Sequence, residues 1–258
     1  MGAGPSLGQG CDRVVNTPYL PAVKTDSPAI HDYASACDNA FYPFNPKFES
    51  IEVMASQLIG LFPTPFVKVD GFLTPEEIAG MAQRARAMVD RQNSATDLLS
   101  HTELVDPASD AYWRALTERV NPHLVRFGDV LFARELKWTV KEIWMNLLKA
   151  GGSQFMHTHA NSFASGIFYI TTPAPSAATV FRKPSTGGEF IFRNDVPLGH
   201  YSADTWQVPD IKAGDLVLYP SYLMHGVPPN DGPERITVAF NAIPDELDSL
   251  GYKIRFGV

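Results

Sequence analysis

The spacing of apolar residues changes along the chain. Between about residues 74 and 127 apolar residues recur at the intervals of amphipathic helices, whereas from about 136 to 245 short apolar runs alternate with turn residues. Helices that precede a run of strands are typical of helices packed on one face of a β-sandwich or barrel, and not of an alternating βα fold. The pattern therefore predicts a mainly β fold packed against N-terminal helices.

Two helices are expected before the strands. The first covers about 74–91 and opens with Thr74, whose hydroxyl can cap the free backbone N–H groups at the helix start. The second covers about 110–127 and should begin at Asp110. We expect it to bend or break near Pro122, because proline removes a backbone donor and crowds the preceding turn.

Residues 1–55 differ from the rest because they carry repeated prolines without sustained periodicity. Proline interrupts regular backbone hydrogen bonding, so we expect an extended N-terminal arm there. The remaining residues, 56–258, should form a single domain with its β core at about 136–245.

Composition narrows the functional classes. The net charge is -7, with 21 Lys and Arg against 28 Asp and Glu, and basic clusters of the kind that nucleic acids or anionic membranes require are lacking. No apolar run approaches the roughly 18 residues of a membrane span, and the two cysteines are too few for a disulfide framework. We therefore expect a cytoplasmic protein without nucleic-acid or membrane partners. The sequence does not indicate an oligomeric state.

His157 and His159 stand two residues apart beside an apolar segment. On an extended strand such residues point to the same face, about 6.6 to 7 Å apart along the backbone. Either histidine alone is more often a hydrogen-bonded structural residue than a ligand. Two neighbouring buried imidazoles each need a polar partner, however, and a single metal ion supplies one for both. The pair therefore predicts a metal site.

His225 is the third candidate ligand. It ends the apolar run "GDLVLYPSYLM" and precedes turn residues, which should place it at the mouth of the β fold. Ten residues further on, Arg235 and Thr237 share one face of the strand "RITVAFN". An arginine and a hydroxyl on one face suit a clamp on a carboxylate. An arginine at a strand end also commonly pairs with a surface acid, here Asp231.

These blocks occur in an order that resembles one family. "LFPTPF" at 61–66, the paired histidines followed by "SFASGIFYI", then "GDLVLYPSYLMH", and then Arg235 with Thr237 are similar to the 2-oxoglutarate/Fe(II)-dependent oxygenases, here a family of largely bacterial and phage proteins. The resemblance covers about residues 57–242. It implies a double-stranded β-helix, also called a jelly roll and shared with cupins, that holds iron at its open end.

The resemblance also implies cofactors and the residues that bind them. The protein would use Fe(II), with 2-oxoglutarate and O2 as cosubstrates. His225 would be the distal metal ligand and His157 the leading one, while Arg235 and Thr237 would bind the distal carboxylate of 2-oxoglutarate.

The sequence departs from the wider superfamily at one metal ligand. Most relatives carry His-x-Asp or His-x-Glu on the first strand, and this chain carries neither. Aligning that motif on His157 puts His159 in the place of the carboxylate and gives a three-histidine site. Aligning it on His159 puts Asn161 there. We favour three histidines, because imidazole suits Fe(II) better than a carboxamide does.

Four further residues are candidates for the site. Trp144 and Asn146 share a strand face, and Asn146 could donate to cosubstrate or substrate, although interior packing explains the pair equally well. The Tyr169 hydroxyl could reach a cosubstrate carboxylate, although an aromatic in "GIFYI" is more often core. Ser165 either lines the site or allows close strand packing.

The sequence thus predicts an Fe(II)- and 2-oxoglutarate-dependent dioxygenase that hydroxylates a small-molecule or amino-acid-type substrate and releases succinate and CO2. One alternative is a three-histidine, cupin-type dioxygenase or isomerase that does not use 2-oxoglutarate. Another is a non-catalytic jelly-roll binding module. Affinity for 2-oxoglutarate that depends on Arg235 separates the first function from the other two.

Overall fold

The computed structural model describes residues 63–88, 91–93, 96–184 and 203–256. The chain divides into two units, Met1–Ile59 and Gly60–Val258, and all described residues belong to the second. The predicted arm, and a predicted strand at "GEFIFRND", lie outside the described residues.

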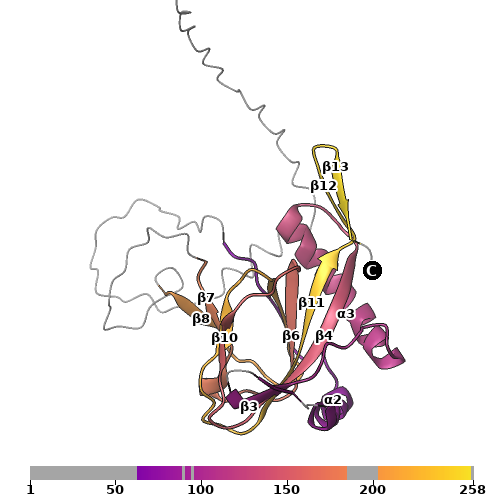
Figure 1. The fold of residues 1–258 in the computed structure, drawn as a ribbon. Helices are drawn as coiled ribbons and strands as arrows, with labels where there is room; N and C mark the ends of the chain where they lie inside the picture. Colours follow the sequence, from indigo (N-terminus) through magenta and orange to yellow (C-terminus); the bar gives the residue numbers. More distant parts are fainter. Residues whose placement is uncertain (1–62, 89–90, 94–95, 185–202, 257–258) are drawn as a thin grey trace, which may run out of the picture. The chain divides into compact units, whose positions relative to one another are not determined.

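The second unit consists mainly of short antiparallel strands, and α2 and α3 are the α-helices within the described residues (Figure 1). This confirms the predicted mainly β fold. The elements, in chain order, are β1 (Val67–Val69), α2 (Pro75–Met88), β2 (Arg91–Asn93), β3 (Thr96–His101), α3 (Ala111–Phe132), β4 (Trp138–Leu148), β5 (Gln154–His157), β6 (Ala164–Tyr169), the 3-10 turn η1 (Pro175–Ala177), β7 (Val180–Arg182), β8 (Thr205–Gln207), β9 (Leu216–Pro220), β10 (His225–Val227), β11 (Arg235–Pro244), β12 (Glu246–Ser249) and β13 (Tyr252–Arg255).

Two antiparallel sheets form the body of this unit. The larger has seven strands in the order β1-β9-β6-β11-β4-β3-β2, and the smaller has four in the order β5-β10-β7-β8. Several neighbours, such as β11 with β4 and β5 with β10, are distant in sequence, as they are in a jelly roll. A final hairpin, β12 with β13, extends from the larger sheet (Figure 1).

Helix α2 begins with the predicted capping arrangement. The backbone N–H of Thr74 donates to Glu77 Oε2 at 2.9 Å, and the backbone N–H of Glu77 donates to Thr74 Oγ1 at 3.2 Å. Each side chain thus satisfies a backbone donor that has no partner within the helix.

Helix α3 is longer than predicted. It begins after Asp110, whose carboxylate accepts from the backbone N–H of Trp113 at 2.9 Å, and it continues past Pro122 to Phe132. The prediction of a break at the proline was therefore wrong. Apolar residues before and after Pro122, including Leu124, are buried against the larger sheet. Burial on both sides holds the helix together despite the lost backbone hydrogen bond.

The main core lies between the helices and the larger sheet. Strand β11 separates this core from a cavity on the other face of the sheet. Ile236, Val238 and Phe240 enter the core, while the alternate residues Arg235 and Thr237 face the opposite side, as predicted. Other large core side chains are Trp113, Phe127, Phe168, Met81 and Met145. No helix in the described part of the chain is long and apolar enough to span a bilayer.

Candidate metal centre

His157 and His225 face each other across two neighbouring strands. His157 ends β5, His225 opens β10, and the antiparallel register pairs them directly. The prediction that His225 ends the preceding apolar strand was wrong, because β9 ends at Pro220 in the larger sheet. The chain then turns and enters the smaller sheet at His225.

His159 lies two residues beyond β5, and not on the strand as predicted. Asn161, in the turn that follows, has φ 56°, a left-handed conformation that asparagine adopts more readily than most residues. The backbone N–H of His159 donates to the carbonyl of Ser221 at 3.0 Å. This bond fixes His159 beside the turn that leads into His225.

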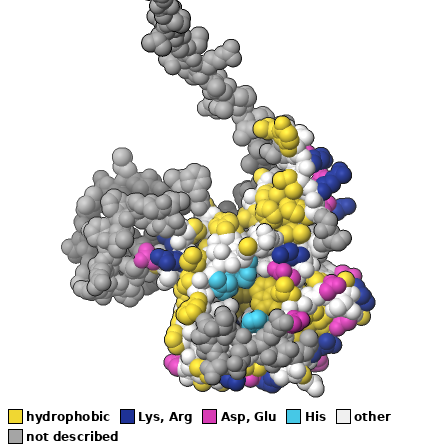
Figure 2. Space-filling model, in the orientation of Figure 1, with side chains coloured by type: hydrophobic (Ala, Val, Ile, Leu, Met, Phe, Trp, Pro, Cys, Tyr) yellow, Lys and Arg dark blue, Asp and Glu magenta, His cyan; other side chains and the backbone are white. Residues whose placement is uncertain are grey.

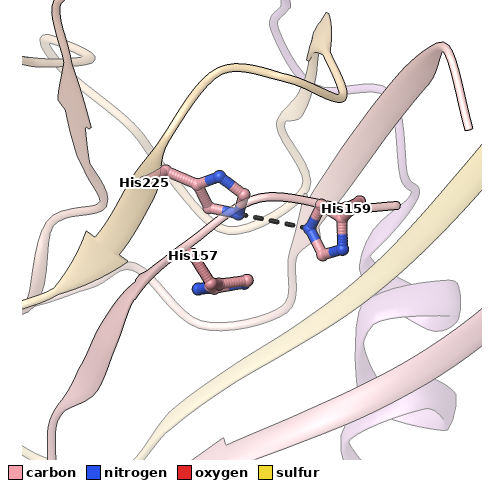
Figure 3. A group of neighbouring side chains, drawn as sticks. All are labelled: His157, His159 and His225. Atoms are coloured by element: carbon pink, nitrogen blue, oxygen red, sulfur yellow. Dashed lines mark hydrogen bonds between the residues drawn. The ribbon is translucent and has the colours of Figure 1, made fainter. Parts of the chain in front are cut away.

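The three imidazoles converge on one point (Figure 3). Ring centroids are 5.1 Å apart for His157 and His159, 4.4 Å for His157 and His225, and 5.1 Å for His159 and His225. One nitrogen of each ring lies within 4.8 Å of the others. The three residues, called the histidine triad below, are therefore close enough to hold one ion.

Hydrogen bonds to the backbone orient two of these rings. His157 Nδ1 donates to the carbonyl of Phe155 at 2.8 Å, and His225 Nδ1 donates to the carbonyl of Leu223 at 2.9 Å. A neutral imidazole that donates from Nδ1 keeps its lone pair on Nε2. His225 Nε2 lies 3.3 Å from His159 Nε2 (dashed in Figure 3). A cation between the two nitrogens would satisfy both lone pairs.

Burial favours the neutral form of both inner histidines. Burial, with a smaller contribution from His157, lowers the pKa of His159 to about 4. The same two causes lower the pKa of His225 to about 3. Both rings are therefore uncharged near neutral pH, which is the form that binds metal.

Arg235 is a buried cation on the same cavity. Its side chain opens β11 and is 4% exposed, and its Nη2 donates to Thr179 Oγ1 at 2.9 Å. Within the described residues Nε has no hydrogen-bond partner and the guanidinium has no carboxylate within ion-pair distance. The alternative partner, Asp231, instead accepts from the hydroxyl of Ser176. A buried guanidinium of this kind suits a carboxylate ligand.

One cavity connects the two features, because the histidine triad and Arg235 both line it. Thr237 and Asn146 line it as well, and they sit opposite each other on β11 and β4. Trp144 is half-buried there, with its ring centroid 5.3 Å from that of His159. Histidine side chains are visible on this face, with charged side chains beside them (Figure 2).

Three predicted residues lie elsewhere. Tyr169 is buried behind the cavity, where its hydroxyl bonds to Thr179 Oγ1 at 2.9 Å and its ring lies 5.5 Å from the Arg235 guanidinium carbon. Ser165 is buried in the larger sheet. Asn161 is exposed in its turn, and neither it nor Ser165 lines the cavity.

Sequence reasoning missed two residues that touch the site. Thr179 supports Arg235, and nothing in "AATVF" distinguished it. Tyr219 places its hydroxyl 3.1 Å from His225 Nε2. Burial raises the pKa of Tyr219 well above its usual value, so the phenol stays protonated and can donate to that nitrogen when no metal takes its lone pair. Its place in the motif "GDLVLYPSYLMH", six residues before His225, was the available signal.

Comparisons with known proteins agree with this geometry. A family model described as "Putative 2OG-Fe(II) oxygenase" matches residues 142–241, which include the histidine triad, Arg235 and Thr237. No curated protein sequence matches the chain significantly.

Solved structures show the same fold at low identity. HygX from Streptomyces hygroscopicus, with nickel, 2-oxoglutarate and hygromycin B bound, is 14% identical, with a TM-score of 0.50 over 70% of this chain and 83% of HygX. The epimerase SnoN, in complex with Fe3+, alpha ketoglutarate and nogalamycin RO, is 16% identical, with a TM-score of 0.52 over 70% of this chain and 80% of SnoN.

The fold is therefore the jelly roll of these oxygenases, and the family resemblance is confirmed. Residues 142–241 thus match the model of the 2-oxoglutarate/Fe(II)-dependent oxygenases, which are enzymes that use Fe(II), 2-oxoglutarate and O2. The donors present fit these groups, because three imidazoles share one cavity with a buried guanidinium that has no carboxylate partner among the described residues.

Proposed function

We propose that the protein is a 2-oxoglutarate/Fe(II)-dependent oxygenase that hydroxylates a C–H bond of a small-molecule or amino-acid-type substrate. The balance is R–H + 2-oxoglutarate + O2 → R–OH + succinate + CO2, in which one oxygen atom enters the product and the other enters succinate. Bound Fe(II) supplies the activation of O2 that this oxidation requires.

In this proposal the histidine triad holds the metal through Nε2 atoms. The Nδ1 bonds of His157 and His225 support this assignment, because they leave both Nε2 lone pairs directed to the common point. A triad without a carboxylate leaves the full charge of the divalent ion uncompensated. That charge favours an anionic cosubstrate.

Arg235 binds the distal carboxylate of 2-oxoglutarate, and its buried, unpaired guanidinium is the observation that carries the proposal. Thr237 Oγ1, 3.4 Å from Arg235 Nη1, adds a hydroxyl, and Asn146 adds an amide from the opposite strand. Tyr169 acts through Thr179, by holding the hydroxyl against which Arg235 rests.

Two structures of similar fold support a small-molecule substrate. The HygX and SnoN structures contain hygromycin B and nogalamycin RO, which are organic small molecules.

The test measures metal and cosubstrate binding separately. Anaerobic Fe(II) protein is titrated with 2-oxoglutarate while the visible absorption of the complex is followed, and succinate formation is then measured in air. Arg235→Met should weaken 2-oxoglutarate binding roughly a hundredfold, as expected for the loss of charge-assisted hydrogen bonds, while Fe(II) affinity is unchanged. His225→Ala should lose Fe(II) itself.

The matched control is Arg255→Met, because Arg255 is an exposed arginine on β13 that pairs with Glu246. It should behave as the unchanged protein in both measurements. The proposal fails if wild-type protein with Fe(II) neither binds nor consumes 2-oxoglutarate, or if Arg235→Met binds it normally.

A further inference from the structure

Strand β4 contains a β-bulge beside the metal centre. Its pairing with β11 runs without interruption from Leu148 to Glu142, and then skips from Glu142 opposite Asn241 to Val140 opposite Ala242. Lys141 is the extra residue. A bulge changes the direction in which the side chains of a strand point, and bulges are over-represented next to active sites.

The bulge brings two charges to the same side of the strand. Adjacent residues on a regular strand point to opposite faces, yet Lys141 Nζ lies 3.0 Å from Glu142 Oε1. The side chains are 22% and 20% exposed, so this pair, called the bulge pair below, lies at the edge between interior and solvent.

The bulge pair is next to the metal centre, on the side away from Arg235. Along β11, Arg235 and Asn241 are six residues apart, or about 20 Å. Trp144, which contacts His159, pairs with Ala239 between them. Glu142 stands two residues before Trp144 on β4 and so shares its strand face, and Asn241 opposite Glu142 shares the face of Ala239. Glu142 therefore lies on the cavity side of β4, one same-face residue pair beyond Trp144 and Ala239, which line the cavity.

A buried polar network fixes Glu142. Asn241 Nδ2 donates to Glu142 Oε1 at 2.7 Å, Ser165 Oγ donates to Asn241 Oδ1 at 2.7 Å, and Ser165 Oγ lies 2.8 Å from Ser221 Oγ. The carbonyl of the same Ser221 accepts from the His159 backbone. The network thus links the position of the carboxylate to that of a candidate ligand. Within the described chain, no hydrogen bond reaches Glu142 Oε2.

We propose that the bulge pair is the recognition site for the primary substrate, and that this substrate carries an α-amino-acid group. Glu142 binds the ammonium and Lys141 binds the carboxylate, while Trp144 supports the carbon chain that reaches the metal. This inference rests on the proposed function and specifies its substrate class.

The chemistry of the pair favours a zwitterion over a single charge. An α-amino acid carries its two charges on one carbon atom, and the bulge pair offers the two complementary charges 3.0 Å apart. A lone cation would be attracted by Glu142 and repelled by Lys141, and a lone anion the reverse, because the two charges lie side by side. As a stabilising contact alone, an ion pair at the surface contributes about 0 to 1 kcal/mol, which explains neither the bulge nor the buried network behind Glu142.

The test uses full-length protein with Fe(II) and 2-oxoglutarate bound under argon. The twenty free L-amino acids are titrated by calorimetry, and those that bind are assayed in air for succinate formation. At least one should bind and accelerate 2-oxoglutarate turnover. Its decarboxylated amine and its deaminated acid should each bind about ten- to a hundredfold more weakly, because each loses one charge-assisted contact.

Glu142→Gln and Lys141→Met should each weaken binding of the amino acid by a similar factor. The affinity for 2-oxoglutarate, measured in the same variants, shows whether the metal centre is still intact. The control pair is Glu246→Gln and Lys253→Met, because these residues also form a Lys–Glu contact of 3.0 Å, on the terminal hairpin and outside the cavity. Neither control should affect the amino acid.

The outcomes separate the two proposals. Loss of 2-oxoglutarate binding in the wild type would contradict the proposed function itself. Intact 2-oxoglutarate turnover without binding of any amino acid would overturn only this inference, as would amines or acids that bind as tightly as the parent amino acid. Normal binding in Glu142→Gln would also overturn it.

Discussion

At the scale of single residues, Arg235 is a buried charge that ligand-free protein does not neutralise within the described chain. Burial is the main cause that lowers its pKa. A buried charge without a partner lowers the free energy of unfolding. A bound anionic ligand would supply the missing opposite charge. Function and stability therefore make opposite demands on this position.

The first prediction follows from that conflict. Arg235→Met, which keeps an unbranched apolar chain, should stabilise the ligand-free protein by about 1 kcal/mol or more, because it removes an uncompensated buried charge. Urea unfolding of metal-free protein gives the free energy of unfolding. A loss of more than about 2 kcal/mol would show instead that the guanidinium holds the fold together through Thr179.

The buried histidines predict acid sensitivity of the metal-free protein. An unfolded histidine has a pKa near 6.5, whereas burial lowers the folded values to about 4 for His159 and about 3 for His225. Between pH 6.5 and the folded pKa values the unfolded state binds more protons than the folded state. The free energy of unfolding should therefore be highest above pH 6.5 and should fall as the pH is lowered toward 3.

Urea unfolding at pH 7.5, 6.0 and 5.0 in the presence of a chelator measures this loss. His225→Gln cannot take up the proton, so its stability should fall less steeply over the same range. Equal slopes for the variant and the wild type would exclude His225 as the cause.

Residue types predicted the site better than the strand pattern did. Paired histidines, a third histidine and an arginine with a threonine indicated the chemistry, and the structure brings all five side chains to one cavity. Thr179 was not foreseeable, because its contact with Arg235 joins residues 56 positions apart. The roles of the five remain proposals, and the binding experiments above test them.

At the scale of elements, the predictions failed where local pattern and tertiary packing disagree. Helix α3 continues through Pro122 because its apolar face is buried on both sides. The apolar run before His225 reads as one strand, yet Pro220 ends β9 and the chain changes sheets. The periodicity of the sequence shows which residues are apolar, but it does not determine the sheet to which each strand belongs.

Strand β10 depends on close contact with β5 at Gly226. A Cβ atom there would lie 2.8 Å from the carbonyl oxygen of Gln154 and 3.1 Å from the backbone N of Met156. Gly226→Ala should push β5 away from β10 and so separate His157 from His225, because backbone atoms cannot yield as a flexible side chain does. We expect lower Fe(II) affinity and a destabilised fold.

Anaerobic Fe(II) titration and thermal unfolding measure the two effects. Gly80→Ala is the control, because a Cβ at this position in α2 meets nothing within 4 Å. Replacing a helical glycine should add about 0.5 to 1 kcal/mol of stability and leave metal binding unchanged. Unchanged Fe(II) affinity in Gly226→Ala would contradict the proposed dependence of the site on β5 and β10 pairing.

At the scale of the whole described unit, the two ends of the proposed cosubstrate site belong to different sheets. His157 and His225 lie in the smaller sheet, whereas Arg235 and Thr237 lie in the larger one. A 2-oxoglutarate molecule bound to the metal at one end and to Arg235 at the other would connect the sheets. Metal alone would act only on the smaller sheet and the His159 turn.

This arrangement predicts that metal and 2-oxoglutarate stabilise the protein cooperatively. A ligand at 100 times its dissociation constant raises the free energy of unfolding by about 2.7 kcal/mol, and two independent ligands would add. Here 2-oxoglutarate should stabilise metal-free protein only slightly through Arg235, and much more once Fe(II) is present, because only then are both ends held. Thermal unfolding under argon, with each ligand alone and with both, measures the coupling.

In Arg235→Met the extra stabilisation from 2-oxoglutarate should disappear while that from Fe(II) persists. Simple additivity in the wild type would show that the cosubstrate does not join the two sheets.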